Sequence, residues 1–453
     1  MRMVKRLLLL LLALVVLLGI AWAWIFSGGE LEGPGEVTKT QLPPQVVAAR
    51  TDTQRETSAA LGGVEGEAGD AKTILFGDLH VHTTFSADAF MRSLPLVQGE
   101  GAHPPADACD FARFCSDLDF WSINDHAESI SPKHWRDTKE AIRQCNAVAG
   151  DPQNPDVVAF LGWEWTQVGT TPENHFGHKN VIFRDTEEDR VPKRPISASG
   201  RSLALLQQGQ PLGQRIGIVL LDLPNRERYL DFGEYQTDLR STQVCEQGVD
   251  TRKLPEDCME TAGTPHELFE KLGQWGFESM VIPHGTTWGL YTPPGTTFAK
   301  QLTSKENDPD RQRLFEIFSG HGNSEEYRDN QEVVQDADGK TVCAEPTAKY
   351  LPCCWQAGEL IRARCGDVPA EQCEQRVREA RANYVAAGVA GHLTVPGVRA
   401  EEWKDCGQCR DCFQPAFSTR PGNSAQFALA LSNFDDPGER KRFRFGFIAS
   451  SDN

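Results

Sequence analysis

The amino-acid sequence predicts an α/β fold with a mostly parallel sheet, preceded by one membrane-spanning helix. Short apolar runs typical of buried strands alternate with helix-like stretches, as in α/β folds. Six of these runs end close to a histidine, glutamate or aspartate, although the chain has only 11 histidines. Functional side chains at successive strand ends are typical of a closed (β/α) barrel, because those ends share one face. We therefore expect a barrel with its functional site at one end.

The N-terminus carries an uncharged apolar run from Leu7 to Phe26, long enough to cross the roughly 30 Å hydrocarbon layer of a bilayer. Basic residues in segment 1–6 predict that this end stays in the cytoplasm and that the remainder is exported. We expect an uncleaved signal anchor that holds the following domain outside the cytoplasm, in the periplasm or on the cell surface. The alternative is secretion after signal cleavage, since Ala21-Trp22-Ala23 fits the small-x-small pattern.

Residues 27–71 contain no aromatic side chain and many glycines, so they bury too little apolar surface to offset their ordering entropy. This composition predicts a flexible tether. The folded domain is expected over 72–453, with two insertions that lack recognisable motifs, at about 185–262 and 322–420.

Acidic residues outnumber basic ones 64 to 46, which gives a formal charge of −18 and argues against nucleic acid as a partner. The chain has 13 cysteines, and export makes them candidates for disulfides. Eight of them lie in the second insertion. Cys245 and Cys258 look like a local pair, and Cys109 with Cys115 could be another.

Cys406, Cys409 and Cys412 are each separated by two residues, a spacing that superficially resembles an iron–sulfur or zinc ligand run. An oxidising compartment favours disulfides for them instead.

The predicted elements follow the chain in a regular order. The expected strands lie at 74–82, 119–123, 157–161, 181–183, 279–283, 314–318 and 443–449, and the expected helices lie at about 108–115, 131–148 and 266–275. Ser131 is placed to cap the second of these helices, with Pro132 at its first position.

The first strand offers the clearest ligand pattern. Residues at positions i, i+2 and i+4 of a strand share one face, so Asp78, His80 and His82 are expected to point the same way. Two imidazoles on one face can approach one metal ion, with Asp78 orienting them from behind. A histidine pair of this kind is equally common on an ordinary surface strand. The further histidines and carboxylates at later strand ends favour the metal site.

These residues resemble the motifs of the PHP superfamily, named for polymerase and histidinol phosphatase. The matching motifs are His80-x-His82 with Asp88, Asp125-His126, Glu164, His178, Pro283-His284 and Ser451-Asp452. The amino-acid sequence around the first motif is most similar to an uncharacterised exported bacterial branch of the superfamily, which is known as a domain of unknown function. The resemblance covers roughly residues 72 to 453 and implies a distorted (β/α)7 barrel with insertions, two or three divalent metal ions and phosphoester hydrolysis.

The resemblance also implies roles for individual residues. The expected metal ligands are His80, His82, Asp88, His126, Glu164, His178, His284 and Asp452. Imidazole and carboxylate ligands together suit Zn, Mn or Fe. Glu164 would bridge two ions and so take part in activating the attacking water. His175 and His321 are candidates to protonate the leaving group, although a supporting or surface position is the alternative for both. Asp78 and Glu316 are expected to support ligands from behind.

The fourth family motif is Asp-x-His, whereas the sequence ends at Asn453, one position before that histidine. We expect the natural chain to continue. The leading hypothesis is an exported, membrane-anchored, metal-dependent phosphoesterase whose substrate is a small-molecule or envelope-derived phosphoester. One alternative is a non-catalytic binding module on a decayed barrel, with the cysteine-rich insertion as its interaction surface. Another is an amidohydrolase-like enzyme that cleaves C–N or ester bonds.

Overall fold

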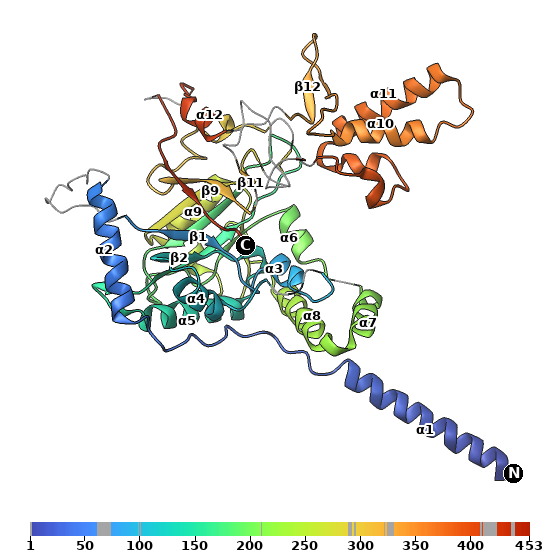
Figure 1. Ribbon diagram of the computed structural model, residues 1–453, viewed down its shortest axis with the longest axis horizontal. Helices are drawn as coiled ribbons and strands as arrows, with labels where there is room; N and C mark the ends of the chain where they lie inside the picture. Colours follow the sequence, from blue (N-terminus) through green and yellow to red (C-terminus); the bar gives the residue numbers. More distant parts are fainter. Residues whose placement is uncertain are drawn as a thin grey trace.

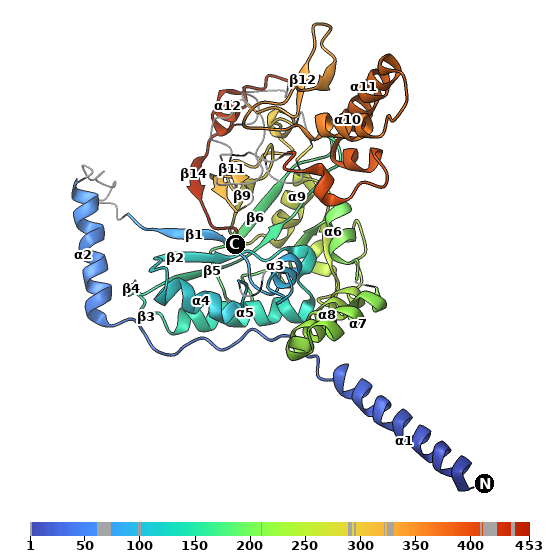
Figure 2. The ribbon, with the colours of Figure 1, turned by 45° about the vertical axis from the view of Figure 1, so that its right-hand side comes forward.

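The main element of the domain is a curled five-stranded sheet that forms half a barrel (Figures 1 and 2). The computed structural model describes residues 2–60, 74–97, 99, 101–209, 211–288, 292–293, 296–320, 322–323, 330–407, 410, 424–435 and 440–453. The strands of this sheet, in spatial order, are β1 (Gly77–Val81), β2 (Phe120–Ile123), β5 (Val158–Trp165), β6 (His178–Phe183) and β9 (Ser279–His284). The sequence placed all five of them within a few residues.

Strands β1, β2 and β5 are parallel, but β6 runs antiparallel to both β5 and β9. The expectation of a mostly parallel sheet is therefore wrong at β6. The connection 166–177 between β5 and β6 contains no helix that could return the chain to the other end of the sheet, so the chain turns directly back.

A second sheet has the order β11 (Gly322–Asn323), β10 (Leu314–Ser319) and β14 (Gly446–Ala449), with β10 and β14 parallel. Its side chains share an apolar interior with the first sheet, in which Leu314 and Ile448 pack against Leu79, Ile182 and Ile282. Just beyond β14, the Asp452 amide donates to the His80 carbonyl at 2.9 Å. The end of the second sheet therefore lies beside the end of β1. The fold is a mixed α/β half-barrel, which confirms the coarse fold class.

Three helices cover the outer face of the curled sheet: α4 (Pro105–Phe114), α5 (Pro132–Ala147) and α9 (Pro265–Trp275). Their ends carry the expected signals. The Ser131 hydroxyl accepts from the His134 amide at the start of α5, and the Thr264 hydroxyl caps α9 in the same way. Pro132 and Pro265 occupy the first helical positions, where the missing N–H costs nothing.

The other elements are short or belong to the insertions. They are α1 (Arg2–Ile25), α2 (Pro44–Ala60), α3 (Ala87–Arg92), β3 (Gly150–Asp151), β4 (Asn154–Pro155), β7 (Ile196–Ala198), α6 (Arg201–Leu206), α7 (Leu212–Leu221), α8 (Arg226–Ser241), β8 (Glu260–Ala262), β12 (Val333–Gln335), β13 (Thr341–Cys343), α10 (Cys353–Ala363), α11 (Ala370–Ala387) and α12 (Ala425–Ala430). Short 3-10 turns join several of them, including one at Leu223–Asn225 between α7 and α8.

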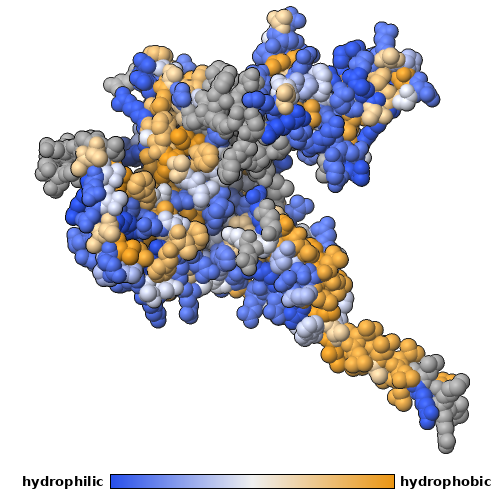
Figure 3. Space-filling view, viewed as in Figure 1, coloured by the Kyte–Doolittle hydropathy of each residue, from blue (hydrophilic) through white to orange (hydrophobic). Residues whose placement is uncertain are grey.

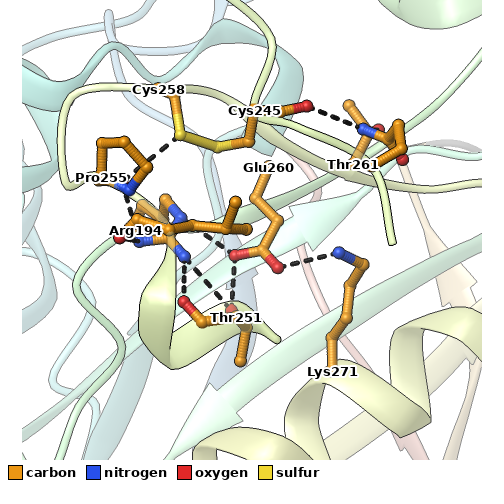
Figure 4. The surroundings of a disulfide bond; sticks show 10 residues. Arg194, Cys245, Thr251, Pro255, Cys258, Glu260, Thr261 and Lys271 are labelled. Carbon is orange, nitrogen blue, oxygen red and sulfur yellow. Dashed lines mark hydrogen bonds and ion pairs between the residues drawn. A yellow bond between two sulfur atoms is a disulfide. The ribbon is translucent and has the colours of Figure 1, made fainter. Parts of the chain in front are cut away.

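Cys245 and Cys258 form the expected local disulfide. Figure 4 shows that it lies beside a buried ion pair, in which Arg194 Nε is 3.0 Å from Glu260 Oε2. The suggested pairing of Cys109 with Cys115 is wrong. Cys109 instead bonds to Cys145 and so ties α4 to α5, while Cys115 is a free, exposed thiol. Six residues along a helix correspond to about 240° of rotation, so Cys109 and Cys115 leave α4 on different sides.

The cysteine-rich insertion holds the hairpin of α10 and α11, which projects away from the half-barrel (Figure 1). Its disulfides are Cys343–Cys354, Cys353–Cys406 and Cys365–Cys373. Cys406 is therefore a disulfide cysteine, as the oxidising compartment favoured. Cys409 and Cys412 lie outside the described residues.

Helix α1 includes a 22-residue apolar stretch, Val4–Ile25, that is long enough to span a bilayer and is not buried in the fold. A signal sequence satisfies the same criterion. Together with the disulfides, this helix favours an extracytoplasmic domain.

Residues 27–60 differ from the flexible tether that composition predicts, because they lie along the domain and include α2. Arg50 Nη2 donates to the Asp156 carbonyl at 2.7 Å, and the Ala106 amide donates to the Pro34 carbonyl at 2.9 Å. Polar bonds of this kind can hold a segment that has little apolar surface, and composition does not reveal them. Residues 61–73 of the expected tether lie outside the described residues.

Candidate metal centre

The centre of the candidate site is Glu164, the second-last residue of strand β5. Neighbouring Trp163 and Trp165 point into the main core beneath the helices and are fully buried. Side chains alternate between the two faces of a strand, so Glu164 points the other way, into the curled interior of the sheet. Its exposed fraction is only 1%. A buried carboxylate requires a positive partner, and five histidines supply the candidates.

The two oxygens of Glu164 face two separate groups of imidazoles. Oε1 lies 2.6 Å from His178 Nδ1 and 3.3 Å from His284 Nε2. Oε2 lies 2.8 Å from His126 Nδ1, 3.4 Å from His82 Nε2 and 3.6 Å from His80 Nε2. His178 and His284 are directly opposite each other in the β6–β9 register, which places both side chains on one face.

His80 and His82 converge as their spacing predicted. Their Nε2 atoms are 3.1 Å apart, and both face Asp452 Oδ1, at 3.5 and 3.3 Å. The other ring nitrogen of His80, Nδ1, lies 3.0 Å from Glu316 Oε2. An ionised carboxylate can only accept, so Nδ1 carries a proton, and in the neutral form of the ring, which is the form that binds a metal, Nε2 presents its lone pair to the site. Glu316 therefore supports His80 from behind, the role predicted for it.

The same reasoning assigns the protons on His82 through the hydroxyl of Ser86. Ser86 Oγ donates to Asp125 Oδ1 at 2.9 Å and accepts from the His126 amide at 3.1 Å. Because the single hydroxyl proton of Ser86 goes to Asp125, Ser86 Oγ must accept a hydrogen bond from His82 Nδ1, which lies 2.8 Å away. In the neutral form of the His82 ring, Nε2 then also has a free lone pair. Asp125 accepts from the Thr83 amide as well, at 2.6 Å, and holds the loop in place.

Two bare imidazole nitrogens 3.1 Å apart, beside two carboxylates, repel each other unless a cation or a proton lies between them. The donor set therefore fits a bound metal ion. Among the residues that the structure describes, three groups of donor atoms lie close enough to hold one: His80, His284, Glu316 and Asp452; His80, His82 and Glu164; and Glu164, His178 and His284. Because Glu164 belongs to two of the groups, its carboxylate can reach two ions. Mixed imidazole and carboxylate donors suit Zn, Mn or Fe.

Asp88 lies at the rim of the site on α3. Its Oδ1 is 3.1 Å from His126 Nε2, and its side chain is 40% exposed. Burial alone would lower the pKa of His126, but the carboxylates of Glu164 and Asp88 outweigh it and raise this pKa well above its usual value. Burial likewise pushes the pKa of Glu164 upward, and His126 and His178 bring it well below the ordinary range. In the absence of metal, protons on the histidines balance the carboxylates.

The two histidines expected to protonate a leaving group have different outcomes. The Gly169 amide donates to His175 Nδ1 at 3.2 Å, which leaves Nε2 to donate to the Gly285 carbonyl at 3.1 Å. Both ring nitrogens are thus bonded to backbone, and burial lowers the pKa of His175 to about 3. This geometry corresponds to a supporting residue rather than a proton donor near neutral pH. His321 lies outside the described residues.

The structure adds participants that sequence reasoning missed. Ser86 links His82, Asp125 and the His126 backbone, and Thr166 Oγ1 is 2.7 Å from His126 Nδ1. Serine and threonine are too common in loops for their positions to single them out. Ser86 could have been found only from its place between the first histidine pair and Asp88. The carboxylate of Asp78 supports the backbone rather than a ligating ring, because it accepts from the His80 amide at 3.0 Å and from the Ser451 amide at 3.1 Å.

Comparison with known proteins identifies no relative: no family model matches the chain, and neither a curated protein nor a solved structure is significantly similar to it. The function of the cluster is therefore argued from its own geometry.

Proposed function

We propose that this protein is an exported, membrane-anchored, metal-dependent hydrolase that acts on phosphoesters and belongs to the PHP superfamily. The observation that carries the proposal is the position of Glu164, whose two oxygens each face a different group of histidines. A carboxylate placed between two sets of nitrogen donors is the arrangement of a bridging ligand in two-metal hydrolases. The motif resemblance described above supports the choice of phosphoesters.

The proposed fold is a distorted (β/α)7 barrel built from β1, β2, β5, β6, β9, β10 and β14. Two contacts between the sheets support it: the Asp452 amide bonds to β1, and the Val281 amide of β9 donates to the Arg311 carbonyl, at 3.0 Å, just before β10. In such a barrel the strand ends that carry the histidines would surround one mouth.

The proposed metal ligands surround Glu164, and further residues support them. His80, His82, His126, His178, His284, Glu164 and Asp452 would hold the ions, with Asp88 at the rim. When bound, divalent ions would supply a water nucleophile at neutral pH and neutralise charge on the phosphoryl oxygens. Glu316 and Ser86 fix the ring orientation and tautomer of His80 and His82, so their Nε2 atoms stay aimed at the site. The net charge of −18 favours a small or envelope-derived phosphoester over a polynucleotide.

The test uses the full chain purified in detergent, stripped of metal and then loaded with Zn or Mn. Metal per chain is measured by elemental analysis, and turnover is measured in parallel on a phosphomonoester, a phosphodiester and a carboxylic ester. Glu164→Gln should lose at least one metal ion per chain and at least a hundredfold in phosphoester turnover. Glu140→Gln, at an exposed position on α5, is the matched control and should change neither.

Three outcomes would contradict the proposal. Wild-type protein that binds less than one metal ion per chain would overturn the metal centre. Metal binding without turnover of any ester would favour a binding module. Turnover of the carboxylic ester alone would favour the amidohydrolase-like alternative.

A further inference from the structure

The C-terminal end of α1 is packed onto the helical hairpin of α7 and α8. Ile25, the last residue of α1, and Phe26 directly after it lie against a buried cluster, here called the anchor cluster, which Leu31 also contacts. The anchor cluster consists of Ala87, Phe90, Leu94, Val219, Tyr229, Phe232 and Tyr235. The proposed membrane anchor therefore does not leave the domain through a free linker. Its exit is fixed against α7 and α8.

Aromatic residues mark where the bilayer surface would lie along α1. Trp22 and Trp24 occupy its last turns and are 52% and 60% exposed. Tryptophan is enriched at the membrane–water interface, where its ring is apolar and its N–H can bond to water or headgroups. The guanidinium carbon of Arg226 lies 4.3 Å from the centre of the Trp24 ring. The first residue of α8 is thus at the same level as the interfacial tryptophan.

The last two residues of α7 and the turn that precedes Arg226 together expose three leucines in four positions. Leu220, Leu221 and Leu223 are 46%, 80% and 38% exposed, whereas Val219 beside them is buried in the anchor cluster. Isolated exposed leucines are ordinary, but a contiguous apolar patch marks a contact surface. Figure 3 shows the apolar surface of α1 continuing onto this hairpin.

We infer that the α7–α8 turn rests on the outer surface of the bilayer that α1 crosses, with Leu220, Leu221 and Leu223 in contact with lipid. The argument for lipid rather than a protein partner is continuity. The leucines lie a few residues from Arg226, and Arg226 is stacked on the tryptophan that would sit at the interface. Burying such side chains at the headgroup and acyl boundary is favourable in proportion to their apolar area. The inference rests on the proposed anchoring by α1 and is independent of the proposed chemistry.

The test measures the depth of a nitroxide probe in full-length protein reconstituted into vesicles of phosphatidylethanolamine and phosphatidylglycerol. The parent carries Cys115→Ser together with Cys409→Ser and Cys412→Ser, which removes the exposed thiol at 115 and the two cysteines outside the described residues, and it reports any remaining background labelling. Probes are placed at Leu221→Cys and Leu223→Cys, and at Asp151→Cys as the control. Asp151 is exposed on β3, which Figure 2 places on the opposite side of the domain from α7.

For each probe, the collision frequency with oxygen, which partitions into lipid, is divided by the collision frequency with a water-soluble nickel chelate. We expect this ratio to be at least threefold higher at 221 and at 223 than at 151. Equal accessibility at 221, 223 and 151 would overturn the inference. Dipolar broadening between copies that disappears on dilution with unlabelled protein would assign the leucines to a second copy and would also overturn it. If the chain fails to float with the vesicles, the proposed anchoring by α1 is wrong and the inference falls with it. Phosphoester turnover in detergent does not depend on anchoring and would test the proposed chemistry separately.

Discussion

Replacing Ser86 by alanine is the sharpest probe of the candidate metal centre, because it removes one hydroxyl and leaves every proposed ligand in place. The Ser86 hydroxyl accepts from His82 Nδ1 at 2.8 Å and thereby leaves the lone pair of Nε2 facing Glu164 and Asp452. In Ser86→Ala the His82 ring loses the partner that sets its tautomer and its orientation. Metal affinity should fall although no ligand has changed.

The size of the effect follows from similar supporting bonds. Loss of a partner behind a ligating histidine typically costs 10- to 100-fold in metal affinity, or about 1.4 to 2.7 kcal/mol. A second effect is separate from metal binding. The His126 amide also donates to Ser86 Oγ, so the substitution leaves a buried N–H without an acceptor, at a cost of about 1 to 3 kcal/mol in the free energy of unfolding.

The assay is a competition titration of Zn against a chelator of known affinity, with the metal-free unfolding free energy measured in urea on the same samples. Thr84→Val is the matched control. Thr84 is as buried as Ser86, and within the residues that the structure describes its hydroxyl has no hydrogen-bond partner. Thr84→Val should therefore bind Zn like the wild type. Equal Zn affinity for Ser86→Ala and Thr84→Val would refute the assigned tautomer of His82 and the role given to Ser86.

Two further predictions concern stability. The disulfide between Cys109 and Cys145 closes a loop with a sequence separation of 36, so the double substitution to alanine should lower the unfolding free energy by about 4 kcal/mol in urea titrations. An unchanged midpoint would contradict this. Burial lowers the pKa of His134 to about 3, so its native ring is neutral while the unfolded ring gains a proton below about 6.5. Stability should thus fall with acidification, and between pH 7.5 and 5 metal-free wild type should lose about 2 kcal/mol more than His134→Phe. Parallel pH profiles for the two proteins would rule this out.

The strand ends were predictable because their signals are local. A run of a few apolar residues is enough to predict a buried strand. Such runs coincide with β1, β2, β5, β9 and β10. The alternation of side chains along a strand also predicted that His80 and His82 would converge.

Features that depend on distant partners were not readable in the same way. Nothing near Cys109 points to Cys145, and nothing in the composition of the segment around Arg50 shows that it bonds to the Asp156 carbonyl. The antiparallel direction of β6 depends on the absence of a helix in the preceding connection, and the sequence pattern there is weak. The tautomer argument required distances, because Ser86 matters only through the three groups that surround its oxygen.

The insertion at 185–262 has no motif of its own, yet it connects the end of α1 to the candidate metal centre. Tyr235 of α8 lies with its hydroxyl 3.2 Å from the Phe85 carbonyl and 3.0 Å from the Ser129 carbonyl, in the loops that follow β1 and β2. The same ring packs in the anchor cluster beside Phe90 of α3, the helix that carries Asp88. One layer of side chains therefore separates the end of α1 from the rim of the candidate metal centre. Since packed cores resist deformation, the proposed contact of the α7–α8 turn with the bilayer would be mechanically linked to the position of Asp88 through α8.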